Sequence, residues 1–171
     1  MHTYNGKRVY PLDLKEEDID INVIAHSLAL QNRYLGHTIF PYSVAQHSWL
    51  MSYEVPEEYA FEALMHDVAE VYCGDMIRPI KYHPKMAAFK DIERNIDVVF
   101  RKRFGLPEEM SQVIKEADTR MAWTERRDVL FPSHADWGPA IEPYSTKIKP
   151  LDWMGAKIKF LNRFNQLTLP A

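Results

Sequence analysis

The chain has a single cysteine, Cys73, among its 171 residues. One cysteine excludes an intrachain disulfide framework and a cysteine-rich zinc module, and it suits a reducing compartment. No apolar run approaches the ~20 residues that a membrane span needs, and the first residues lack the apolar core of a secretion signal. We therefore expect a cytoplasmic protein with no membrane partner.

The chain also lacks an excess of positive charge. Its 24 acidic residues outnumber its 21 lysines and arginines, for a formal net charge of -3. A chain of this charge has no broad positive field with which to hold a long nucleic-acid backbone. We therefore exclude long nucleic acids as partners and expect any phosphate to be held by a few local side chains.

Apolar residues make up 46% of the chain, enough for one substantial core, and no internal repeat or low-complexity tract is present. We expect one domain over residues 1–171. Apolar side chains recur at helical spacing in several segments, and these predict helices over residues 16–31, 43–51, 56–74, 84–104, 108–130 and 151–167.

The remaining segments are expected to be non-helical. Asn5-Gly6 suits the positive-φ positions of a tight turn, which predicts a small hairpin over residues 1–12. A connector containing Pro79 follows Gly74, and the proline-rich, polar residues 132–150 predict a loop. The fold class is therefore all-α, a compact helical bundle with a small N-terminal β-hairpin.

The dipeptide His66-Asp67 lies within an apolar helical run. An ionised carboxylate there needs a partner to offset its loss of hydration, and a metal ion is one such partner. His47 and Asp118 lie on otherwise apolar or small-residue faces of other predicted helices, and could converge on the same point. Imidazole and carboxylate together suit borderline or hard divalent ions.

These residues also have ordinary structural interpretations. His66 and Asp67 could form a buried, hydrogen-bonded pair without any metal. Asp118 could pair with Arg120 or Lys115 on its own helix. An adjacent histidine and aspartate occur by chance in many chains, so the dipeptide alone does not decide between these interpretations and a metal site.

Short blocks of polar and charged residues accompany the dipeptide along nearly the whole chain. They are residues 32–34 (NRY), 43–48 (SVAQHS), 66–70 (HDVAE), 74–81 (GDMIRPIK) and 116–118 (EAD). In content and order these blocks resemble the HD-domain phosphohydrolases, most closely the bacterial 5′-deoxynucleotidases and the related phage deoxyadenosine triphosphate triphosphohydrolases. The resemblance implies an HD-domain helical bundle that hydrolyses nucleotide phosphates with the help of a metal.

By this resemblance, the metal ligands are His47, His66, Asp67 and Asp118. The implied cofactor is one divalent metal ion, with Co, Mn, Zn, Fe and Mg all chemically possible. Such an ion lowers the pKa of a bound water and draws charge away from phosphorus, which are two contributions that phosphate-ester hydrolysis needs.

The resemblance also implies two catalytic acids, Glu70 and Asp75. Glu70 falls four residues after His66 and so on the same helical face, where it can reach the site without binding the metal. In the family these acids orient or deprotonate the attacking water and assist the leaving oxygen. Salt bridges to Arg78 or Lys81 are the alternative for both.

Four residues are implied to bind substrate. Arg33 matches the substrate arginine of the family and Lys81 a second phosphate contact, although both could be solvated surface charges. Tyr34 stands where relatives often carry tryptophan beside the sugar. Arg78 replaces a small polar residue of the nearest nucleotidases, and could extend the cationic site toward a second or third phosphate.

The sequence therefore predicts hydrolysis of deoxyribonucleotides, with monophosphates and also triphosphates as candidate substrates. A triphosphohydrolase that prefers deoxyadenosine triphosphate is the alternative enzyme. A non-catalytic nucleotide-binding module is the alternative from another class, but such a module would be expected to have lost some of the implied ligands and acids, and this chain retains them. The resemblance also implies a homo-oligomer, a dimer or larger.

Overall fold

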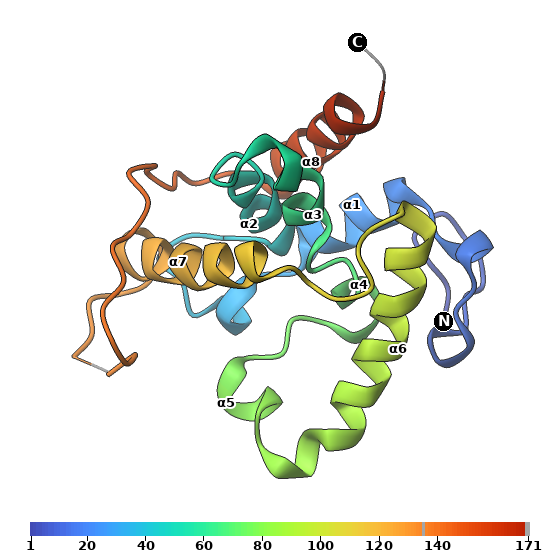
Figure 1. Cartoon of the computed structure of the whole chain (residues 1–171), viewed down its shortest axis with the longest axis horizontal. Coiled ribbons are helices and arrows are strands. Elements are labelled where there is room, and N and C mark those ends of the chain that lie inside the picture. Colours follow the sequence, from blue (N-terminus) through green and yellow to red (C-terminus); the bar gives the residue numbers. More distant parts are fainter. Residues whose placement is uncertain (135, 170–171) are drawn as a thin grey trace.

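The computed structural model describes residues 1–134 and 136–169, and these residues are mostly helical, as the sequence predicts (Figure 1). The helices are α1 (Ile21–Leu30), α2 (Val44–Met51), α3 (Ala60–Met65), α4 (Glu70–Cys73), α5 (Arg78–Lys81), α6 (Ala87–Phe104), α7 (Gln112–Asp128) and α8 (Trp153–Thr168). None of the helices in these ranges combines the length and apolarity that a membrane span requires.

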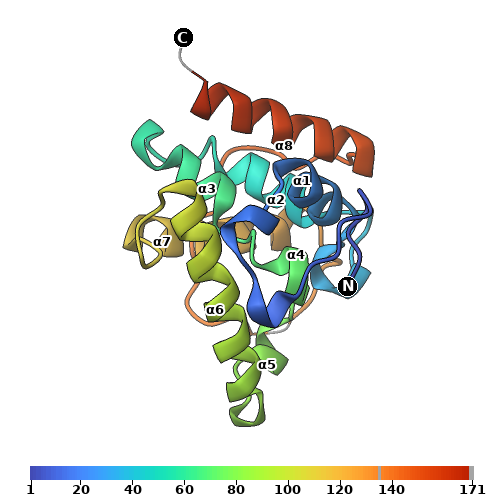
Figure 2. The same cartoon turned by 90° about the vertical axis from the view of Figure 1, so that its right-hand side faces the viewer.

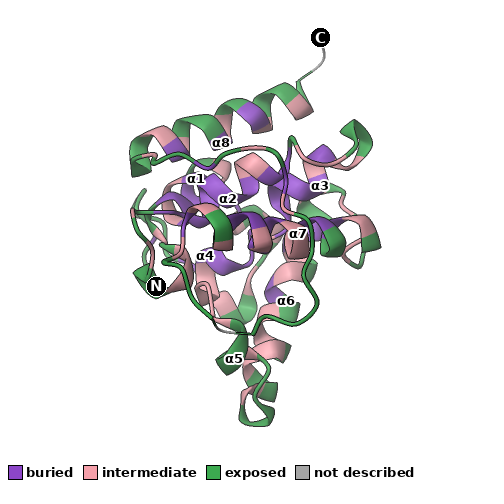
Figure 3. Cartoon of the chain, turned by 90° about the vertical axis from the view of Figure 1, so that its left-hand side faces the viewer, coloured by how far each residue is buried: buried purple, intermediate pink, exposed green. Residues whose placement is uncertain are grey.

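Helix α2 lies at the centre of the bundle, packed against α1, α3, α7 and α8. Helix α8 crosses one end of the molecule over α1, α2 and α3, while α5 lies at the other end beside the start of α6 (Figure 2). Buried residues form two hydrophobic clusters, to which α2 contributes Val44 and Ala45 on one side and Met51 on the other. Burial is concentrated around α2, and α5 is mostly exposed (Figure 3).

Polar side chains begin the longer helices at the positions where backbone N–H groups have no helical partner. The side chains of Asp20, Ser43, Ser111 and Asp152 accept hydrogen bonds from the first turns of α1, α2, α7 and α8. Gly105 adopts a left-handed conformation after α6 and ends that helix. These caps fix where the site-bearing helices α2 and α7 begin.

The N-terminal hairpin that the sequence predicts is not confirmed. Within the described residues, the segment makes a turn closed by the bond from Gly6 N–H to the Thr3 carbonyl and a single isolated bridge between His2 and Arg8. No strand forms there. The Asn-Gly turn therefore brings the two arms together, but the pairing does not extend into a β-hairpin.

The helix predicted over residues 56–74 is interrupted at the HD dipeptide. Helix α3 ends at Met65 and α4 begins at Glu70, and the N–H groups of Val68, Glu70 and Val71 bond to carbonyls three residues earlier. In such tight turns residues three apart lie on one face. Glu70 therefore shares a face with Asp67, three residues before it.

Smaller differences concern helix ends. Helix α1 begins at Ile21, after a separate 3₁₀ turn over Glu16–Asp18, and α7 begins at Gln112. The connector with Pro79 contains the short helix α5, in which proline occupies the first turn and costs no hydrogen bond. Residues 132–134 and 136–150 form no helix, as expected for the loop, and Ala135 of that prediction lies outside the described residues.

The turn before α2 is strained. Tyr34 and Leu35 both have positive φ angles, 55° and 52°, in a 3₁₀ segment that runs from Arg33 to Gly36. Left-handed backbone is costly for residues with a side chain, and strain of this kind gathers at functional sites. This turn carries two of the predicted substrate residues.

We expect Leu35→Gly to stabilise the protein, because Leu35 is 61% exposed and its side chain contributes little packing to offset the left-handed backbone. The relieved strain exceeds the entropy that glycine adds to the unfolded chain, for a net gain of about 0.5–1 kcal/mol. Thermal unfolding should then occur at a midpoint roughly 1–4 °C higher. Leu12→Gly, at an exposed residue without positive φ, should give no gain; an unchanged or lower midpoint for Leu35→Gly would contradict the prediction.

Candidate metal centre

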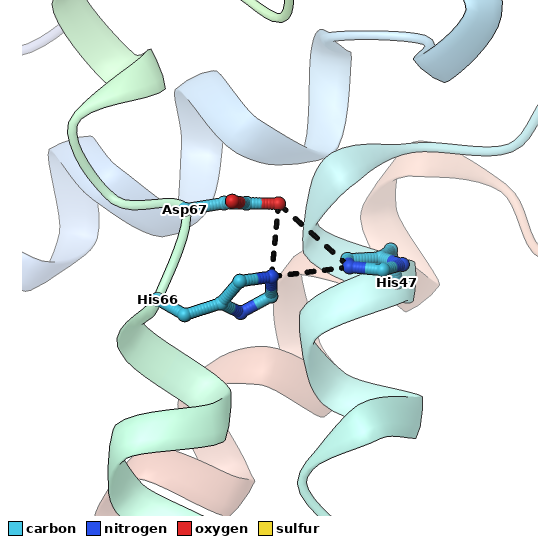
Figure 4. Close-up of side chains that lie close together, drawn as sticks. All are labelled: His47, His66 and Asp67. Carbon is cyan, nitrogen blue, oxygen red and sulfur yellow. Dashed lines mark hydrogen bonds and ion pairs between the residues drawn. The ribbon is translucent and has the colours of Figure 1, made fainter. Parts of the chain in front are cut away.

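His47, His66 and Asp67 converge on one point between α2 and the turn after α3 (Figure 4). His66 Nε2 lies 3.1 Å from Asp67 Oδ2 and 3.2 Å from His47 Nε2, and His47 Nε2 lies 3.7 Å from Asp67 Oδ2. Both imidazoles are buried, and the Asp67 side chain retains 19% exposure. Together they are a group of side chains that could hold a metal ion.

A hydrogen bond at Nδ1, the ring nitrogen that faces away from the cluster, fixes the orientation of each imidazole. His66 Nδ1 lies 2.7 Å from the Ala63 carbonyl, and His47 Nδ1 lies 2.6 Å from Glu125 Oε1. Carbonyl and carboxylate oxygens only accept hydrogen bonds, so each Nδ1 carries a proton. In the neutral rings both Nε2 atoms then present lone pairs to each other and to Asp67, an arrangement that requires a cation.

A divalent metal fits this donor set. Ligand atoms that bind one ion at ~2.0–2.2 Å lie roughly 3–3.5 Å from one another, close to the separations observed here. The rings must be neutral to bind a metal. Without one, a proton can occupy this place: burial lowers the pKa of His66, but the adjacent Asp67 charge and hydrogen bond raise it above its ordinary value.

Asp118, the fourth predicted ligand, reaches the same point from α7. Its Oδ1 lies 3.5 Å from His47 Nε2, while its Oδ2 accepts a hydrogen bond of 2.9 Å from Arg78 Nη2. The Arg78 side chain is 58% exposed. The structure therefore brings Asp118 to the edge of the cluster, and gives Arg78 a carboxylate partner that the sequence did not indicate.

Arg33 and Tyr34 lie beside the cluster, held by a buried acid. Arg33 Nη1 lies 3.4 Å from Asp67 Oδ2, and Arg33 Nε lies 3.3 Å from Glu125 Oε1. The Tyr34 hydroxyl donates a short hydrogen bond to Glu125 Oε2. Burial disfavours ionised Glu125, but Arg33 and His47 outweigh it and lower the pKa of Glu125 to about 2.

Glu125 is a residue of the site that was not predicted from the sequence. It lies seven residues after Asp118, two helical turns along the same face of α7, and its side chain is 0% exposed. That spacing is the signal that could have found it, because a glutamate on an inward face needs a buried partner just as Asp67 does.

The two predicted catalytic acids, Glu70 and Asp75, lie close enough to Asp67 to feel its charge. Glu70 is buried, and its Oε2 has no hydrogen-bond partner within the described part of the chain. Burial and the charges of Asp67 and Asp75 raise the pKa of Glu70 well above its ordinary value. Burial also raises the pKa of half-buried Asp75, with Asp67 adding to the effect and Arg33 opposing it.

Lys81 is near this group but engaged elsewhere. Its Nζ donates a hydrogen bond of 2.8 Å to Glu93 on α6. Burial lowers the pKa of Lys81, but this bond and the Glu93 charge raise it. The structure thus gathers the predicted metal ligands with Arg33 and Tyr34, and leaves Lys81 in an ion pair on α5.

The helical bundle, with a histidine on one helix beside a His-Asp pair in the turn after another, defines an HD-domain phosphohydrolase. Residues 8–130 match the family described as 5′-deoxynucleotidase YfbR-like, and the chain belongs to that family. It is therefore a hydrolase of the HD superfamily, whose members use a divalent metal.

Several related proteins are similar to this chain over most of its length. The uncharacterised protein YfdR of Escherichia coli is 42% identical over 97% of this chain and 94% of its own length. An uncharacterised protein of Rhodobacter capsulatus is 33% identical over 77% of this chain and 74% of its own length. A Vibrio parahaemolyticus protein named 5′-deoxynucleotidase VP0926 is 28% identical over 78% of this chain and 71% of its own length.

Proposed function

We propose that this protein is a metal-dependent 5′-deoxynucleotidase that hydrolyses deoxynucleoside monophosphates to a deoxynucleoside and phosphate. The observation that carries the proposal is the convergence of His47 Nε2, His66 Nε2 and Asp67 Oδ2 with their lone pairs facing one another. The family match and the relative named 5′-deoxynucleotidase support the choice of substrate.

In this proposal His47, His66, Asp67 and Asp118 hold one divalent ion, which, when bound, polarises the phosphate and lowers the pKa of a water molecule. Co, Mn, Zn, Fe and Mg are all compatible with two imidazoles and two carboxylates. Asp118 binds through Oδ1, because its Oδ2 is bonded to Arg78.

We assign proton transfer to Glu70 and Asp75. Glu70 is buried beside Asp67, has a free Oε2 among the described residues and has a raised pKa, so it is suited to accept a proton from the attacking water. A proton must also reach the leaving 5′ oxygen of the sugar. The two acids share these tasks.

Substrate binding falls to cationic and aromatic side chains around the cluster. Arg33 can grip the phosphate with its guanidinium, which already lies within 3.4 Å of Asp67. Tyr34, held on the same turn, would face the sugar. Lys81 can bind the phosphate only if its ammonium group leaves Glu93 and donates to a phosphate oxygen instead.

The experiment that tests the function is a release assay across deoxy- and ribonucleoside mono-, di- and triphosphates, with each divalent metal in turn. We expect phosphate release from deoxynucleoside monophosphates, dependent on metal and abolished by a chelator. Tight nucleotide binding without release under every metal would instead identify a binding module.

Triphosphate hydrolysis is a separate prediction, since Arg78 is cationic, exposed and adjacent to the cluster. If Arg78 contacts additional phosphates, a deoxynucleoside triphosphate should be a substrate, and Arg78→Thr should impair it more than the monophosphate. A charge-assisted hydrogen bond contributes about 1.5–3 kcal/mol, so the selective loss in kcat/KM should be roughly tenfold or more.

The monophosphate serves as the internal control for Arg78→Thr. Equal losses on both substrates would show that Arg78 acts by holding Asp118 and not by contacting phosphates. Absence of triphosphate hydrolysis by the wild type would leave a monophosphate nucleotidase, and would also remove the deoxyadenosine triphosphate triphosphohydrolase as an alternative.

A further inference from the structure

Glu125 touches both the metal centre and the residues that face the substrate. Its Oε1 lies 2.6 Å from His47 Nδ1 and 3.3 Å from Arg33 Nε, and its Oε2 lies 3.4 Å from Arg33 Nη2 and accepts from the Tyr34 hydroxyl. The side chain is 0% exposed. Donors from α2 and from the strained turn before it therefore meet on one buried carboxylate of α7.

The contact with His47 determines what that ring can do. Because Nδ1 donates to Glu125, Nε2 is left to face His66, Asp67 and Asp118. A carboxylate behind a metal-binding histidine fixes the ring's tautomer and orientation, and makes it a stronger ligand.

The contacts with Arg33 and Tyr34 determine where the substrate-facing residues lie. Arg33 spans the distance between Glu125 and Asp67, so one guanidinium links the two carboxylates. Tyr34 has a left-handed backbone, and its hydroxyl bond to Glu125 ties this strained turn to α7. A displacement of Glu125 would therefore move both substrate residues together with His47.

We propose that Glu125 is a positioning residue that couples the metal centre to the groups that hold the sugar and the phosphate. The inference rests on the proposed function, which supplies the metal and the substrate. The competing explanation is that Glu125 serves only as the counter-charge of buried Arg33. That role would affect folding, but it would not affect metal affinity.

Glu125→Gln tests the proposal because glutamine has nearly the same shape but offers an amide donor where the carboxylate accepts. We expect the dissociation constant for Mn²⁺, measured by isothermal titration calorimetry on metal-free protein, to rise roughly 10- to 100-fold. At saturating Mn²⁺ the KM for deoxyadenosine monophosphate should also rise, by roughly fivefold or more, through lost contacts to Arg33 and Tyr34.

Two matched variants isolate the effect. Tyr34→Phe removes only the hydroxyl, so KM should rise while the Mn²⁺ dissociation constant stays within about twofold of the wild type, since Glu125 keeps its charge and its Oε1 contact with His47. Glu109→Gln makes the same chemical change at an exposed position before α7 and should alter neither quantity. Circular dichroism verifies folding of each variant.

Glu125→Asp keeps the counter-charge of Arg33 but is one methylene shorter, so it cannot reach His47 and Tyr34 together. Weakened Mn²⁺ binding in this folded variant supports positioning. Wild-type Mn²⁺ affinity in folded Glu125→Gln or Glu125→Asp overturns the inference and leaves Glu125 as a counter-charge. Wild-type protein that binds Mn²⁺ but releases no phosphate refutes the proposed function, while the titrations still decide the role of Glu125 at His47.

Discussion

His66→Ala and Asp67→Ala should each lose bound metal and reduce turnover by roughly a thousandfold or more, while the protein stays folded and helical. The metal would supply several kcal/mol of transition-state stabilisation, and each ~1.4 kcal/mol lost slows the reaction tenfold. Both side chains present donor atoms to the same point, within 3.1 Å of each other. Removing either one breaks the donor set that fits the ion.

Folding should survive these substitutions because the hydrophobic clusters around α2 are built from aliphatic and aromatic side chains, and include neither residue. Metal analysis after gel filtration, circular dichroism and the release assay together decide the outcome. His134→Ala, at an exposed histidine, is the control and should keep metal and turnover. Full metal occupancy in either site variant would refute the ligand assignment.

The long helices were the most predictable part of the fold. In α6 a repeating apolar pattern ends at Gly105, and that glycine does adopt the left-handed conformation that stops the helix. Asn5-Gly6 likewise forms its turn, but a turn does not determine how far the arms pair, so the expected hairpin reduces to one bridge. Pairing depends on tertiary contacts that a local pattern does not contain.

The break between α3 and α4 was not predictable from periodicity. Apolar residues continue on both sides of His66-Asp67, as they would in one helix, while the backbone tightens to bonds three residues apart. The consequence is local but matters for the site. It keeps Glu70 on the face of Asp67, three residues before it, while the predicted continuous helix is lost.

The convergence of His47, His66 and Asp67 could be anticipated because histidine and aspartate on apolar faces require partners, and the family blocks indicated which ones. The ion pairs around the cluster could not be anticipated. Arg78 and Lys81 have long side chains that can reach several acids, and only the tertiary structure selects Asp118 for Arg78 and Glu93 for Lys81. Glu125 was missed because no block of the resemblance contains it.

Glu70→Gln should retain metal but lose roughly 10²- to 10⁴-fold in kcat, the range expected when a general acid or base is removed. Glutamine fills the same space and keeps the buried position, but its amide cannot take a proton from water. Metal content should match the wild type, because neither Glu70 oxygen belongs to the group of donor atoms that converge at His47, His66 and Asp67.

The contrast with Asp67→Ala separates proton transfer from metal binding on the same face of the chain. Asp67 and Glu70 lie on one side of the tight turn, yet Asp67 Oδ2 points at both imidazoles, whereas Glu70 Oε2 has no partner among the residues described. If Asp67→Ala loses both turnover and metal, whereas Glu70→Gln loses turnover but keeps its metal, the two carboxylates have different tasks.

Glu58→Gln, at an exposed glutamate before α3, is the control and should leave kcat unchanged. A wild-type kcat in Glu70→Gln at saturating metal would contradict this role for Glu70. Proton transfer would then be assigned to Asp75, the remaining acid whose raised pKa and proximity to Asp67 suit it to that step.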